Sequence, residues 1–259
     1  MSEPSVVVIT GASSGIGAAL ALQLGQRGDR VVLAARRELE LADVARRVGA
    51  GALAVPTDVT RRAEVERLRD RAIAAFGHID VWVNNAGRGI GKTVLELSDD
   101  DVDAIIAVNL KSALYGMQTI VPHFVARGGG HIVNVSSFLS RVPLATFRSV
   151  YSASKAALNT LTANLRMDLA AAHPNIHVSL VIPGMVTTEF HQSALGGTPP
   201  MPARPRGVPA AQTADEVAAA IAGVIDRPVA ELYTNPQHPA IASRYYQDVG
   251  AFERAQRIN

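Results

Sequence analysis

Short aliphatic and β-branched runs alternate with helical segments along most of this chain. The run at 6–9 is typical, because it ends at Gly11 and an apolar face with helical spacing then extends to Gly28. We expect strands at 6–9, 31–33, 53–55, 81–83, 132–135, 176–182 and 229–233. We expect helices at 16–28, 41–49, 61–76, 98–127, 150–172 and 214–226. This alternation predicts an α/β fold with a doubly wound, mostly parallel sheet of about seven strands and helices on both faces.

Length and composition exclude several classes of protein. A chain of 259 residues with 48% hydrophobic and 19% charged residues can bury a large core, and we expect a single domain over 1–259. A sequence without cysteine excludes disulfides, thiol catalysis and cysteine-bound metals. His173 and His177 are four residues apart, but Pro174 breaks the helix that would align them, so we predict no metal site. A net charge of +2 and 5% aromatic residues predict no nucleic-acid partner.

The sequence shows no sign of a targeting or membrane-spanning segment. Residues 1–4 carry an acid and no base, unlike a signal peptide. No apolar run approaches the roughly 18 residues of a membrane span. We therefore expect a cytoplasmic protein with no membrane span.

Two segments late in the chain lack a clear pattern. Residues 196–209 are rich in glycine and proline, which predicts a lid or binding loop, with a disordered surface excursion as the alternative. A strand is still expected at 229–233, so this loop is not a domain boundary. The weakly helical tail at about 240–257 is expected to pack on the body of the protein or on a second subunit.

The loop at 10–17 reads Thr-Gly-Ala-Ser-Ser-Gly-Ile-Gly and joins the first strand to the first helix. Such glycines let backbone N–H groups at a helix N-terminus approach a pyrophosphate. Gly11-x-Ser13-x-Gly15 also matches the nucleophile elbow of serine hydrolases. That function requires an acid and then a histidine facing Ser13, and no late histidine lies in a loop that obviously does so. We favour the nucleotide site and keep a serine hydrolase using Ser13 as a remote alternative.

Residues 86–93 nearly match a nucleotide-binding P-loop, with Ala86 in place of its first glycine. A P-loop requires its helix to begin at Lys92 and Thr93, whereas the capping-box signal here lies later, at Ser98. We therefore interpret Lys92 as a solvated loop residue.

Tyr151 and Lys155 lie four residues apart in the helix expected at 150–172, which places both on one helical face. A nearby ammonium favours phenolate and lowers a phenol pKa toward the working range. Such a tyrosine is suited to act as a general acid or base on a carbonyl or alcohol oxygen.

With these motifs in their observed order, the chain resembles the short-chain dehydrogenase/reductase family, in its single-domain branch. The resemblance covers most of residues 5–233 and implies a Rossmann fold. It depends on Thr10-Gly11-x-x-x-Gly15-x-Gly17, Asn84-Asn85-Ala86-Gly87, Asn109, Ser136-Ser137, Tyr151-x-x-x-Lys155 and Pro183-Gly184.

The resemblance implies an NAD(P)-dependent oxidoreductase that interconverts a ketone or aldehyde and an alcohol. Tyr151 then gives the proton to the carbonyl in reduction, and Lys155 lowers its pKa and holds the nicotinamide ribose. Ser137 is favoured over Ser136 as the residue that bonds the substrate oxygen. Asn109 is expected to hold a water next to Lys155, to bond at a helix kink, or to do both.

The resemblance also suggests which cofactor is used. Family members that bind NAD carry an acidic residue at the end of the second strand, where this chain has Ala35 followed by Arg36. Because a guanidinium suits a phosphate, we expect NADP(H) to be favoured over NAD(H), unless Arg36 and Arg37 are merely solvated. The implied cofactor-binding residues are Gly11, Ser13, Ser14, Gly15, Ile16, Gly17, Arg36, Arg37, Asp58, Val59, Asn85, Ala86, Gly87, Tyr151, Lys155, Pro183, Gly184, Val186 and Thr188.

The sequence leaves the substrate open. The expected substrate loop covers about 188–211, and an apolar pocket, usual for ligand sites, is expected from Phe138, Leu139, Val142, Leu144, Met185 and Phe190. Arg141 and Arg148 are expected either to meet an anionic substrate or to face water. The expected partners are a small carbonyl or alcohol substrate and a second copy, in a homodimer or homotetramer. A catalytically silent dinucleotide-binding sensor or scaffold is the alternative function.

Overall fold

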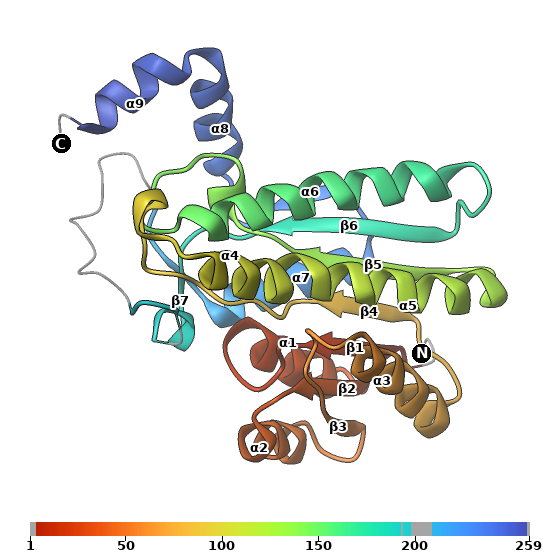
Figure 1. Ribbon diagram of the computed structural model, residues 1–259. Coiled ribbons are helices and arrows are strands. Elements are labelled where there is room, and N and C mark those ends of the chain that lie inside the picture. Colours follow the sequence, from red (N-terminus) through yellow and green to blue (C-terminus); the bar gives the residue numbers. More distant parts are fainter. Residues whose placement is uncertain (1–3, 193, 198–208, 258–259) are drawn as a thin grey trace.

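The computed structural model describes residues 4–192, 194–197 and 209–257. Its central sheet contains seven parallel strands in the order β3-β2-β1-β4-β5-β6-β9 (Figure 1). The strands are β1 (Val6–Thr10), β2 (Arg30–Ala35), β3 (Ala52–Pro56), β4 (Val81–Asn84), β5 (Gly130–Val135), β6 (Ile176–Ile182) and β9 (Glu231–Tyr233). The predicted doubly wound parallel sheet is therefore confirmed.

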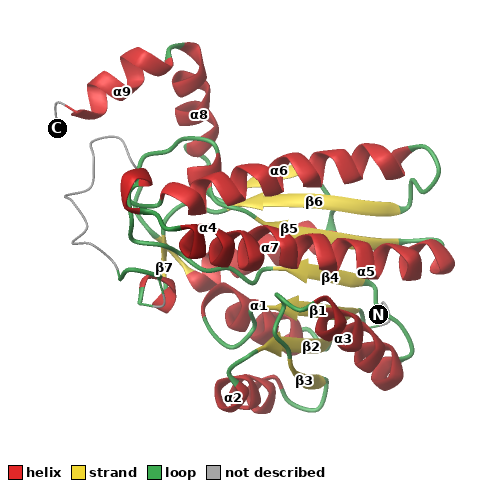
Figure 2. Cartoon of the chain, viewed as in Figure 1, coloured by secondary structure: helices red, strands yellow, loops and turns green. Residues whose placement is uncertain are grey.

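Helices cover both faces of this sheet (Figure 2). One face packs against α1 (Gly15–Gln26), α2 (Glu38–Val48) and α7 (Ala214–Asp226). The other face packs against α3 (Arg62–Phe76), α5 (Ser112–Arg127) and α6 (Ser149–Ala170). Along β1, Val7 and Ile9 belong to the first core and Val8 to the second. Burial on both faces explains why the strands are continuous apolar runs instead of alternating ones.

The helix expected at 98–127 forms, but it changes its pitch in the middle. It begins as α4 (Asp99–Ile106), widens into a π-helical segment (Ala107–Lys111) and continues as α5. Asn109 lies in the widened segment, and its side chain is fixed to the backbone of Arg88. Local widening of this kind often marks a functional site.

By length and composition alone, the continuous stretch 99–127 could cross a membrane. In this structure it instead packs against α3 and α6, as a core helix of a globular protein does. We therefore read its apolar character as a consequence of packing.

The second half contains elements that the sequence did not predict. β7 (Val186–Thr187) pairs with β8 (Gln212–Thr213) in a separate two-stranded sheet. The strand expected at 229–233 begins only at Glu231, and the carbonyls of Val229 and Ala230 before it accept hydrogen bonds from the side chains of Ser179 and Arg166. Short 3-10 turns are formed in the second half by Phe138–Ser140 and Glu189–His191, and earlier in the chain by Val94–Glu96.

The expected C-terminal tail consists of two helices. They are α8 (His238–Gln247) and α9 (Val249–Arg257), and α9 extends away from the sheet (Figure 1). Tyr245 of α8 and Phe252 of α9 pack together with ring centroids 5.4 Å apart. Half of the expected substrate loop, residues 193 and 198–208, lies outside the described residues.

A buried histidine in β5 links folding to pH. The Nε2–H of His131 donates to Ser179 Oγ at 2.8 Å, because the Ser179 hydroxyl itself donates to the Val229 carbonyl. His131 Nδ1 is then an unprotonated, buried atom with no hydrogen-bond partner. Burial, with a smaller effect of His177, lowers the pKa of His131 to about 4. His131 is therefore neutral in the folded protein over the whole physiological range.

We predict that acid destabilises the fold through His131. As the pH falls below about 6.5, the unfolded chain binds a proton that folded His131 does not, so stability is lost between pH 6.5 and 4. Between pH 7.5 and pH 5.0 the expected loss is about 2 kcal/mol. Urea unfolding at pH 7.5 and pH 5.0 measures it, and H131Q should lose less stability than the wild type between these two values. An equal loss in both proteins would contradict the assignment.

Candidate active site

A large cavity lies at the carboxyl edge of the sheet. Its volume is about 660 Å³, and it is lined by the loops that follow β1, β2, β3, β4, β5 and β6. β1 and β4 are neighbours at its centre, where the chain connects β1 to β2 on one side and β4 to β5 on the other. Such a switch point in a parallel sheet opens a crevice in which ligands bind.

The glycine loop at 10–17 forms one wall of this cavity. Gly11 has a φ of +69°, and a Cβ on it would lie 2.8 Å from Ala86 Cα. A Cβ on Gly17 would collide with the Gly11 carbonyl oxygen. In the described structure, Ser14 precedes α1 without capping it, and the first turn of α1 contains no acidic side chain. The N–H groups of this turn therefore favour an anion in front of the helix.

Residues 84–87 are held against the glycine loop. Thr10 Oγ1 accepts hydrogen bonds from the backbone N–H groups of Asn85 and Ala86, each at 3.1 Å. The Asn85 amide donates to the Thr10 carbonyl at 2.9 Å. Asn85, Ala86 and Gly87 consequently line the cavity, as the sequence predicts.

The near P-loop does not have P-loop structure. Lys92 and Thr93 lead into a single 3-10 turn, Val94–Glu96, instead of an α-helix. Lys92 Nζ forms an ion pair of 2.6 Å with Asp101, the acid of the capping box of α4. The interpretation of Lys92 as a merely solvated residue is therefore wrong.

One face of α6 is fixed to the end of β5 by polar contacts. The helix residues involved are spaced three or four apart, which places them on one side of the helix. The pairs, helix residue first, are Thr162–Asn134, Asn159–Ser136, Lys155–Val135 and Tyr151–Ser137. Tyr151 and Lys155 thereby reach the cavity from a fixed position.

Two adjacent serines follow β5 in different environments. Ser136 is buried and donates to Asn159 Oδ1, so its hydroxyl holds α6 to the sheet. The Ser137 hydroxyl accepts from the Leu139 N–H at 3.2 Å and acts on the nearby Tyr151 phenol, whose pKa it lowers. This arrangement agrees with the preference for Ser137 as the residue next to a reacting oxygen, and that role stays a prediction.

The electrostatics around Tyr151 differ from the sequence-based expectation. Burial raises the pKa of the Tyr151 phenol, and the hydrogen bond to Ser137 and the charge of Arg148 oppose this effect. We expected Lys155 to be the cation that lowers this pKa. The Lys155 ammonium instead donates to the Val135 carbonyl at 2.8 Å, and burial lowers the pKa of Lys155 to about 8.

Asn109 reaches the cavity region from the π-helical segment. Its Oδ1 accepts from the Arg88 N–H at 2.8 Å, and its Nδ2 donates to the Arg88 carbonyl at 3.0 Å and to Ser154 Oγ at 3.1 Å. The expected helix-kink role is thus present in the structure. A water held between Asn109 and Lys155 stays a prediction.

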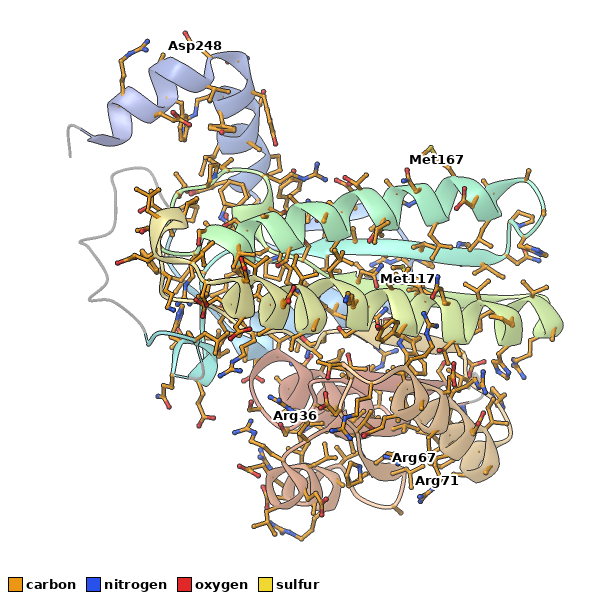
Figure 3. All side chains as sticks on the ribbon, viewed as in Figure 1. Arg36, Arg67, Arg71, Met117, Met167 and Asp248 are labelled. Carbon is orange, nitrogen blue, oxygen red and sulfur yellow. The ribbon has the colours of Figure 1, made fainter. Side chains whose placement is uncertain are left out.

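The two arginines after β2 have different surroundings. Arg37 donates to the hydroxyls of Ser13 at 3.1 Å and Ser14 at 2.6 Å, so it closes the glycine loop from outside. Arg36 (labelled in Figure 3) is exposed and lines the cavity, together with Asp58 and Val59.

The segment after β6 forms another wall. Pro183, Gly184, Val186 and Thr188 all line the cavity. The Thr188 methyl group lies 3.4 Å from the place that a Cβ on Gly15 would occupy. The glycine loop and the segment after β6, distant in sequence, therefore meet at Gly15.

Arg148, His191 and His238 also line the cavity, although the sequence left Arg148 as an open alternative and assigned no role to the two histidines. Arg148 is buried and donates to the Ile90 carbonyl at 2.9 Å and to His191 Nδ1 at 2.8 Å. His238 stacks on Phe138 at 3.9 Å, and burial lowers the pKa of His238 to about 4. A signal for Arg148 was its place one helical turn before Tyr151. His191 and His238 lie in segments without a motif, so nothing in the sequence indicated them.

Two sequence-based alternatives can be assessed against the structure. Ser13 Oγ accepts hydrogen bonds from Arg37, and no histidine contacts it in the described part of the chain. A serine hydrolase requires such a histidine as its general base, so the structure does not support the hydrolase alternative. Arg141 neither lines the cavity nor faces only water, because it forms an ion pair of 2.8 Å with Glu231.

Comparisons with known proteins agree with this geometry. The family model described as short chain dehydrogenase matches residues 5–196. An uncharacterized oxidoreductase of Staphylococcus epidermidis is 37% identical over 186 residues, which are 72% of this chain and 80% of that protein. A short-chain dehydrogenase/reductase from Burkholderia phymatum in complex with NAD has a TM-score of 0.85 and 29% identity, and the match covers 96% of each chain. An alcohol dehydrogenase from Thermococcus sibiricus complexed with 5-hydroxy-NADP has a TM-score of 0.76 and 28% identity, over 89% of this chain and 96% of that one.

The doubly wound sheet and these relatives place the chain among the oxidoreductases with a Rossmann fold. More specifically, it belongs to the short-chain dehydrogenase/reductase family.

We predict that two helical glycines respond oppositely to alanine. Gly17 has no room for a Cβ, so G17A should lose about 2 kcal/mol of stability and distort the glycine loop. A Cβ on Gly223 of α7 would meet nothing within 4 Å, so G223A should gain about 0.5–1 kcal/mol. Chemical denaturation measures both changes. A G17A variant as stable as the wild type would show that the loop is more adaptable than its packing indicates.

Proposed function

We propose that this protein is an oxidoreductase that interconverts a ketone or aldehyde and an alcohol, with NADP(H) favoured over NAD(H). One observation carries the proposal. The glycine loop and Arg36, which suit a dinucleotide, line the same cavity as Ser137, Tyr151 and Lys155, which suit a carbonyl oxygen.

The cavity residues fit a dinucleotide. The uncapped start of α1 and the nearby glycines provide N–H groups for a pyrophosphate. Asp58 and Val59 lie where an adenine would be held, and Val186 and Thr188 lie on the wall expected to hold the nicotinamide carboxamide. Lys155, next to Gly87, would hold the nicotinamide ribose.

When bound, the nicotinamide cofactor supplies or accepts the hydride. The phenol of Tyr151 gives the proton to the carbonyl oxygen in reduction and takes it from the alcohol in oxidation. Ser137, whose hydroxyl acts on that phenol, positions the substrate oxygen beside it. Burial of Tyr151 favours the protonated phenol, so the cavity as described suits reduction.

The preference for NADP(H) is inferred from the end of β2. Ala35 provides no carboxylate to repel a 2′-phosphate, and Arg36 follows it at the cavity wall. Arg37 already donates hydrogen bonds to Ser13 and Ser14, so we assign the contact with the 2′-phosphate to Arg36.

Fluorescence titration with NADPH and NADH tests this choice. We expect tighter binding of NADPH, and R36A should weaken it about tenfold while leaving NADH binding unchanged. Arg71, an exposed arginine on α3 outside the cavity lining, provides the control R71A (Figure 3). A preference for NADH would overturn the assignment of Arg36, and binding of neither cofactor would overturn the proposed function.

Substitutions of the two serines and of Tyr151 test the chemistry. We expect Y151F and S137A to lower kcat/KM for a carbonyl substrate at least 100-fold with unchanged NADPH affinity. S136A should keep activity but lose about 1 kcal/mol of stability, because Asn159 loses its donor. Steady-state kinetics and urea unfolding give the two readouts. A wild type that binds NADPH but reduces no ketone or aldehyde would support the silent binder instead.

A further inference from the structure

Two buried cations share the cavity, and no buried anion balances them. Among the Asp, Glu, Lys and Arg residues that the structure describes, Arg148 and Lys155 alone are buried. Both line the cavity. A buried charge is costly unless it is paired, so this arrangement favours a negatively charged occupant.

A bound cofactor would contact only one of these two cations. Lys155 lies beside Gly87 and Val135, in the part of the cavity assigned to the nicotinamide ribose. The pyrophosphate and 2′-phosphate belong at the start of α1 and at Arg36. Arg148 instead lies near Gly89 and Phe190. We place the substrate in this part of the cavity, because apolar side chains line it.

Among the described residues, no acidic side chain pairs with Arg148. Burial lowers the pKa of Arg148, and the other group that acts on it is the phenol of Tyr151. The acids that line the cavity are Asp58, beside Arg36 and Arg61, and Glu189, which is 3.9 Å from Arg37. His191 does not carry a competing charge, because its Nδ1 accepts a hydrogen bond from Arg148 and burial lowers its pKa.

The guanidinium is rigidly held and still has donors to offer. Two of its five N–H groups are directed at the Ile90 carbonyl and His191. Among the described residues, no acceptor is bonded to its Nε. Because the side chain lines the cavity, we place an anion there against the remaining N–H groups. Two fixed contacts lower the entropic cost of binding an anion.

We propose that the substrate carries a carboxylate, which pairs with Arg148 while the carbonyl group lies at Tyr151. This inference rests on the proposed function and names its substrate class. Phe147 and Phe190 lie beside Arg148, and Leu139 and Leu144 line the same cavity, so we expect the body between the two groups to be apolar. A single guanidinium suits a carboxylate monoanion, whereas a phosphate dianion calls for additional cations.

Matched ketones that differ only in charge test the inference. The probes are 4-acetylbenzoate and its methyl ester, and 4-oxopentanoate and its methyl ester, each assayed with NADPH. We expect the wild type to prefer at least one acid over its ester tenfold or more in kcat/KM. R148M should remove this preference by lowering kcat/KM for the acid at least tenfold more than kcat/KM for the ester.

Two further variants distinguish the effect of the Arg148 charge from the role of Arg148 in holding its two loops. R148K keeps the positive charge and should keep part of the preference for the acid. R141M removes the arginine that pairs with Glu231 outside the cavity lining and should leave the preference unchanged. Equal losses on acid and ester in R148M would overturn the inference, because Arg148 would then only hold its two loops. A wild type that turns over the esters as well as the acids would also overturn it, while the proposed function would stand.

Calorimetry makes the inference testable without turnover. If no ketone is reduced with either cofactor, the proposed function fails, and 4-acetylbenzoate is titrated into the protein with NADP⁺ present. Binding that R141M keeps and R148M loses supports the carboxylate site. A wild type that binds neither 4-acetylbenzoate nor 4-oxopentanoate overturns it.

Discussion

The polar face of α6 against the end of β5 is the interaction on which the rest of the site depends. A buried donor or acceptor left without a partner costs about 1–3 kcal/mol, so paired side chains at successive turns strongly favour one register. The contacts continue inward, since Asn134 accepts from Asn84 at 2.8 Å and Asn84 accepts from Trp82 at 2.8 Å. The position of Tyr151 is thus tied to the central strands.

The parallel sheet brings loops that are distant in the sequence together at one site. Because its strands all point the same way, the loops after β1, β2, β4, β5 and β6 gather at one edge. The opposite edge carries a different kind of residue, such as Asp80, which accepts from the backbone of Val6 at 2.8 Å. Stability and chemistry are therefore partly separated between the two edges, as the acid-sensitive His131 near the start of β5 also illustrates.

Most of the fold could be predicted because burial on both faces leaves apolar runs that stand out between helical segments. The glycine loop and Ser137 could be predicted because they follow strands, and Tyr151 and Lys155 because a spacing of four residues places them on one face of a helix. Three other features depend on tertiary contacts, which leave no periodic pattern in the sequence. They are the π-helical turn at Asn109, the hydrogen bond from Lys155 to the Val135 carbonyl and the ion pair of Lys92 with Asp101. The Arg148–His191 contact joins two irregular segments, so the sequence could only leave Arg148 as an open alternative.

The contact between Thr10 and residues 85–86 has a consequence for the order of folding. The glycine loop is complete only when β4 has paired with β1, which joins segments more than seventy residues apart. Long-range pairing of this kind is slow, because loop closure precedes the contacts that stabilise it. The first two strands and α1 alone therefore form an unfinished loop. A dinucleotide site built this way matures late, and a ligand that binds there stabilises the finished central sheet instead of guiding its assembly.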